Sequence, residues 1–79
     1  MRKTQKGCLN MNNYIINKNS DENGRNEVHT TTCAHKPLLH NQVSLGWHSN
    51  AISAVAYAKH IGWKTADGCY YCCEEAHRG

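Results

Sequence analysis

The residues best suited to chemistry lie late in the chain, where one histidine and three of the five cysteines fall within residues 67–77. Cys69 and Cys72 form a Cys-x-x-Cys pair, whose two thiolates lie about one turn apart and can bind the same metal ion. His29 and Cys33 form a second pair far upstream. Because structural zinc takes four thiolate or neutral imidazole ligands in a tetrahedron, the two pairs together predict a Cys₃His zinc site.

Other ligand sets and other states of the cysteines are open at this point. Cys73 follows Cys72 directly, and His77 lies five residues beyond Cys72, so His77 is the first substitute for His29 as the fourth ligand. Disulfide pairing and free buried thiols are the alternatives to a bound metal. Since a closed four-ligand site leaves no position for an activated water, we expect a structural metal and no catalytic residue.

The length of the chain, 79 residues, limits it to one small domain. A core of this size supplies no more than about 3 to 5 kcal/mol, so a further stabilising device such as a metal is expected. No apolar run approaches the roughly 18 residues that a membrane span needs. We therefore expect a cytoplasmic protein that makes no contact with membranes. Because thiols in the cytoplasm are kept reduced, we expect the clustered cysteines to bind metal rather than form disulfides.

The positive charge of the chain is concentrated at its start. The formal net charge is +3 at pH 7, and the first eighteen residues contain four basic residues and no acidic one. Residues 1–12, which include the isolated Cys8, show no apolar periodicity and are expected to form a flexible basic leader. Residues 19–79 carry five basic and six acidic residues. This balance disfavours a strongly basic nucleic-acid-binding body, although the leader can contact phosphates weakly.

The pattern of apolar and turn residues predicts three short strands. Residues 13–18 and 27–32 have strand character and are separated by a polar stretch, in which Asn23-Gly24 supplies the positive φ of a reversal. Residues 42–47 alternate, which predicts a third strand with Val43, Leu45 and Trp47 on one face. Ahead of this strand, we expect Leu38 and Leu39 to plug a loop onto the core.

A single helix is predicted over residues 51–61. Ser49 or Asn50 suits its N-cap, and Gly62 suits its end, with Trp63 folding back as an apolar clasp. After the helix, a tight turn at Asp67-Gly68 presents Cys69. The expected fold is thus one α+β mini-domain, residues 13–79, in which a three-stranded antiparallel sheet packs on one helix. We expect four aromatic residues to pack in its core: Trp47, Trp63, Tyr70 and Tyr71.

These features resemble those of a group of small bacterial proteins of uncharacterised function, over about four-fifths of the chain. The resemblance supports the fold and implies no particular activity. It rests on Glu27-Val28-His29, Cys33, Leu45-Gly46, the alanine-rich residues 51–58 and Gly68-Cys69-Tyr70-Tyr71-Cys72.

The order of motifs is also similar, more distantly, to the N-terminal zinc domain of the Ada DNA-repair methyltransferase. That domain carries Cys-x₃-Cys, Asn-x-Val, an alanine helix, Gly and Cys-x₂-Cys, and His29 stands here in place of its first cysteine. In Ada-like domains one zinc-bound cysteine accepts a methyl group, so the resemblance implies an acceptor at Cys33 or Cys69. The matching positions are His29, Cys33, Asn41, Val43, Ala54, Ala58, Gly62, Cys69 and Cys72.

Together, the sequence predicts a small zinc-stapled domain that binds a protein or nucleic-acid partner rather than catalysing a reaction. Two alternative functions remain open: a nucleic-acid-binding module that uses the basic leader and exposed aromatics, and an Ada-like zinc-thiolate methyl acceptor.

Overall fold

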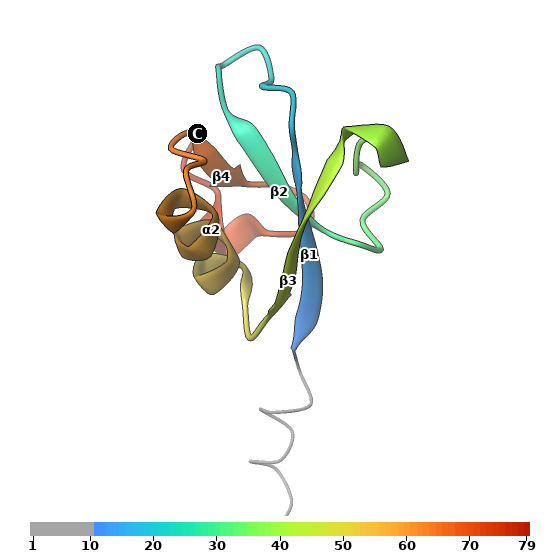
Figure 1. The fold of residues 1–79 in the computed structure, drawn as a ribbon, viewed down its shortest axis with the longest axis vertical. Coiled ribbons are helices and arrows are strands. Elements are labelled where there is room, and N and C mark those ends of the chain that lie inside the picture. The colour runs from blue at the N-terminus through green and yellow to red at the C-terminus, as the bar shows by residue number, and fades with distance from the viewer. Residues whose placement is uncertain (1–10) are drawn as a thin grey trace, which may run out of the picture.

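The computed structural model describes residues 11–79, in which one helix packs against one face of a four-stranded sheet (Figure 1). The predicted flexible leader falls outside these residues, apart from Met11 and Asn12, and Asn12 is the first residue of β1. No helix within residues 11–79 is long and apolar enough to cross a membrane. The elements are β1 (Asn12–Asn17), β2 (Asn26–Thr30), the 3-10 turn η1 (Leu39–Asn41), β3 (Gln42–His48), α2 (Ala51–His60), β4 (Ala66–Gly68) and the 3-10 turn η2 (Glu74–Ala76).

The hairpin of β1 and β2 forms as predicted. The strands are antiparallel, with Ile15 opposite His29 and Ile16 opposite Val28. The reversal between them uses Gly24, whose φ is 78°. The side chain of Asp21 accepts hydrogen bonds from the backbone N–H groups of Asn23 and Arg25, at 2.8 and 2.9 Å, which fixes the turn.

The sheet has four strands in the order β3-β1-β2-β4, one more than the three strands that were predicted. The fourth strand, β4, pairs parallel to β2, with Asn26 opposite Ala66 and Val28 opposite Gly68. The prediction of a purely antiparallel sheet is therefore wrong. Residues 66–68 are too short and too polar to carry a strand pattern, and their main chain becomes a strand because β2 offers an open edge to it.

A bulge partway along β3 changes which of its side chains face the core. Leu45 is an extra residue opposite β1, since Tyr14 pairs with Gly46 and the next residue of β1 pairs with Ser44. Gly46 takes a φ of 81°, which only glycine adopts freely, and completes this bulge. Leu45 is buried but Trp47 is 63% exposed, so the prediction that Trp47 packs in the core is wrong. The bulge is the reason, because simple alternation fails across it.

Helix α2 begins and ends close to the predicted residues. The side chain of Asn50 accepts a hydrogen bond from the N–H of Ser53 at 2.8 Å, which makes Asn50 the N-cap. At the other end, Gly62 donates to the carbonyl of Lys59 and Trp63 donates to that of Ala58, the pattern of a Schellman motif. Trp63 then packs against the core as predicted.

The core between the sheet and α2 is built mainly from small side chains. Its larger members come from the strands, and the helix contributes three alanines and one valine. Leu38 and Leu39, expected to plug the core, are instead 70% and 81% exposed. A core so poor in large side chains buries little apolar area, as expected of a domain that needs another source of stability. The cluster consists of Tyr14, Ile16, Val28, Cys33, Leu45, Ala51, Ala54, Val55, Ala58, Ala66, Cys69, Cys73 and Ala76.

Candidate metal centre

Two segments that are far apart in sequence carry the predicted ligands to one place. His29 lies in β2, and Cys33 follows the end of that strand in a turn, where its N–H donates to the carbonyl of Thr30. Cys69 comes directly after β4, and Cys72 lies in the turn before η2. Because β4 pairs with β2, the start of the second segment is placed beside the first.

Glycine at position 68 is needed for this placement. A Cβ there would lie 2.5 Å from the carbonyl oxygen of Cys73 and 2.9 Å from the side chain of Ala76. These distances are too short for any side chain, because the chain folds back closely over the end of β4. The same backbone donates from Cys69 N–H to the carbonyl of Val28 at 2.9 Å, which holds Cys69 against the strand that carries His29.

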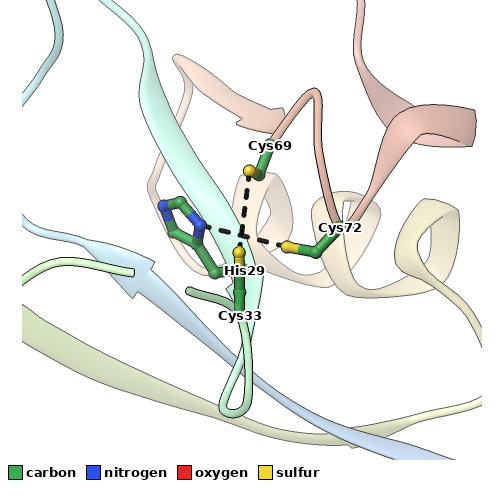
Figure 2. Close-up of side chains that lie close together, drawn as sticks. All are labelled: His29, Cys33, Cys69 and Cys72. Carbon is green, nitrogen blue, oxygen red and sulfur yellow. Dashed lines mark hydrogen bonds between the residues drawn. The ribbon is translucent and has the colours of Figure 1, made fainter. Parts of the chain in front are cut away.

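The four predicted ligands, His29, Cys33, Cys69 and Cys72, form what we call the ligand cluster (Figure 2). One ligand atom from each lies within 4.8 Å of all the others, and the group can hold a metal ion. The Sγ atoms of Cys33 and Cys69 are 4.0 Å apart, and Cys72 Sγ is 3.9 Å from His29 Nδ1. Ligands of a tetrahedral zinc ion lie about 3.4 to 3.8 Å apart, so the cluster would contract by up to about 1 Å on binding zinc in that geometry.

His29 is held in the orientation that a metal ligand needs. Its Nδ1 faces the cysteines, while its Nε2 lies 3.5 Å from the carboxylate of Glu27. Burial lowers the pKa of His29 and raises the pKa of Glu27. These directions favour a neutral imidazole, whose Nε2 is turned toward Glu27, over an ion pair, and leave the lone pair of Nδ1 for a cation. A carboxylate behind the ligand imidazole is common at metal sites.

Burial also raises the pKa values of the two adjacent cysteines in the second segment. It raises the pKa of the Cys72 thiol well above its usual range, and it raises the pKa of Cys73 to about 11. Both are therefore thiols near neutral pH unless a cation acts on them. A divalent cation deprotonates the thiols that bind it, and the cluster offers it three sulfur atoms and one nitrogen.

The two alternative ligands, Cys73 and His77, lie outside the cluster. Cys73 is fully buried in the core, although its Sγ is 3.7 Å from that of Cys72. His77 turns its Nδ1 to the carbonyl of Gly68 at 3.0 Å and to the carboxylate of Asp67 at 3.4 Å. The geometry therefore favours His29 over His77 as the imidazole ligand.

The two tyrosines inside the Cys-x-x-Cys turn point to solvent, so the prediction that Tyr70 and Tyr71 pack in the core is wrong. Tyr70 is 57% exposed and Tyr71 is 68% exposed. Since Cys69 and Cys72 point inward on either side of them, the residues between are turned outward. That spacing is the sequence signal that would have placed both tyrosines on the surface.

A comparison of the chain with protein-family models found no match, and comparisons with curated proteins and with solved structures found none either. The resemblances to the small bacterial proteins and to the Ada zinc domain therefore stay predictions. Within residues 11–79, the ligand cluster is the group of side chains that could hold a metal ion.

Proposed function

We propose that the chain is a small zinc-stapled interaction domain, in which the ligand cluster binds one structural Zn²⁺ ion. The observation that carries this proposal is the convergence of four ligand atoms within 4.8 Å from two segments about forty residues apart. Three sulfurs and one imidazole nitrogen suit zinc better than the hard cations, which prefer oxygen ligands. The cytoplasmic location stays a prediction from the sequence.

A structural role fits the positions of the ligands. Three of the four are buried and Cys72 is half-buried, so little space is left for a substrate beside the ion. The ion would join the end of β2 to the turn after β4, where few large apolar side chains hold the chain together. Cys33 and Cys69 are only 6% and 1% exposed. Their burial supports a structural role over the methyl-acceptor alternative, because an acceptor sulfur must be reached by its donor.

Two neighbouring cysteines offer a matched test of the ligand set. Native mass spectrometry of the zinc-loaded chain should show one zinc per molecule. Cys72→Ala should lose most of the metal, because it removes a ligand, whereas Cys73→Ala should keep one zinc although it leaves a small cavity in the core. X-ray absorption at the zinc edge should show three sulfur ligands at about 2.3 Å and one nitrogen at about 2.0 Å.

Equal zinc content in the two variants, or an absorption spectrum dominated by oxygen ligands, would refute the proposal. Circular dichroism of each variant with excess zinc shows whether the fold is retained and keeps the comparison interpretable.

A further inference from the structure

Two histidine rings and two tyrosine rings contact one another in a continuous row, and we call them the aromatic row. His35 stacks on Tyr71, with ring centroids 4.0 Å apart and planes 18° from parallel. Tyr71 meets Tyr70 edge to face at 5.3 Å, and Tyr70 meets His77 in the same way at 5.5 Å. His35, Tyr70 and Tyr71 are exposed, and His77 is half-buried.

The aromatic row depends on the same two segments as the ligand cluster. His35 follows Cys33 by two residues and its N–H donates to the Sγ of Cys33 at 3.4 Å, while both tyrosines lie between Cys69 and Cys72. An ion in the cluster would therefore fix the two halves of the row relative to each other. A rigid set of rings loses little entropy when a flat ligand stacks on it.

Positive charge lies at both ends of the row. Lys36 follows His35, and Arg78 follows His77; both are exposed. Among the described residues, neither of them forms an ion pair with a carboxylate, and the guanidinium of Arg78 contacts only backbone carbonyls. Carboxylates lie near the row as well: that of Asp67 is 3.4 Å from the Nδ1 of His77, and that of Glu27 is turned to His29.

We propose that the aromatic row is a docking surface for single-stranded nucleic acid, whose bases stack on Tyr70 and Tyr71 while the flanking cations contact phosphates. This inference rests on the proposed function for the rigidity of the row, because a bound metal would fix its two halves relative to each other, whereas stacking on Tyr70 and Tyr71 does not itself need the metal. Bases stack on aromatic side chains without regard to sequence, and a few cations are enough to follow the backbone. Duplex binding is disfavoured, since residues 11–79 carry six basic and six acidic residues and so present no strongly basic body.

Fluorescence anisotropy with a labelled oligothymidine of about 12 nucleotides tests the surface, because that length lies within the range such platforms span. The full zinc-loaded chain should bind the single strand more tightly than a duplex of equal length. The logarithm of the binding constant should fall against the logarithm of salt with a slope of about −1.4 to −2.8, for two to four phosphates contacted. Tyr71→Ala should weaken binding at least about fivefold.

Tyr57→Ala is the matched control, because Tyr57 is also an exposed tyrosine, 41% exposed on α2, and lies outside the row. Its affinity should equal that of the unchanged chain, and native mass spectrometry should find one zinc in both variants. Absence of oligonucleotide binding, equal loss in the two variants, or binding of peptides alone would overturn the inference.

Metal content separates the two proposals. If the unchanged chain carries no zinc but binds oligothymidine through Tyr71, the structural-zinc proposal fails and the docking surface stands. If zinc is bound and Tyr71→Ala has no effect, the docking surface fails alone.

Discussion

His29 is suited to bind a metal because of the residue two positions before it. Neighbours two apart on a strand share a face, so Glu27 and His29 lie side by side, with the carboxylate 3.5 Å from Nε2. That contact favours the tautomer in which the lone pair of Nδ1 is free to bind a cation. His77 shows the opposite case, since its Nδ1 already faces the carbonyl of Gly68 and the carboxylate of Asp67.

Replacing Glu27 should therefore weaken zinc binding without removing a ligand. We expect Glu27→Ala to lower the zinc affinity about tenfold, because the imidazole loses the group that orients it. Competition with a chromophoric chelator at fixed pH measures the effect. Glu22→Ala is the control, since Glu22 is an exposed glutamate in the hairpin turn, and it should bind zinc as the unchanged chain does. Identical affinities for both variants would show that the Glu27 contact has no influence on the metal.

At the scale of elements, β4 and the turn after it decide where the second pair of ligands lies. Only three residues form this strand, and its last residue, Gly68, is in contact with the carbonyl of Cys73 and with Ala76. The C-terminal segment then returns to the helix, where the carboxylate of Glu75 accepts a hydrogen bond from the first N–H of α2. The Cys-x-x-Cys turn is thus held from both sides.

Gly68→Ala should disturb this arrangement. We expect it to lower the free energy of unfolding by about 1 to 3 kcal/mol, because the new Cβ overlaps backbone atoms that have little room to move. It should also weaken zinc binding, since Cys69 is displaced. Urea unfolding and zinc competition measure the two effects.

Gly24→Ala gives the contrast. Gly24 has a φ of 78° but no atom within 4 Å of its Cβ position, so alanine there should cost about 1 kcal/mol of strain and leave the zinc affinity unchanged. A Gly68→Ala variant that matches the unchanged chain in both measurements would contradict the close approach at the end of β4.

Local signals predicted the local elements. The hairpin turn, the Asn50 cap and the Gly62 end of α2 each depend on residues next to one another, and each is confirmed. The convergence of the two ligand pairs was predicted from ligand chemistry, and the structure brings them together. Strand β4 could not be predicted, because its three residues become a strand only by pairing with β2. Trp47 was misplaced because the bulge at Leu45 and Gly46 shifts the side chains of β3.

At the scale of the whole molecule, the apolar core is too modest to explain the fold alone. Most of the residues that α2 buries are alanines, and many of the large apolar side chains are exposed. Three of the four members of the ligand cluster are themselves buried, so a metal there would act at the interior of the domain. Structural zinc sites of this kind contribute about 10 to 16 kcal/mol to folding at neutral pH, far more than this core can supply.

The dependence of the fold on bound zinc is tested most directly by a chelator titration of the zinc-loaded chain. Native mass spectrometry and circular dichroism are measured on the same samples. We predict that one zinc per chain is lost in the same range of chelator concentration in which the secondary structure is lost, and that added zinc restores both. A chain that keeps its folded spectrum after the last zinc has gone would contradict the account.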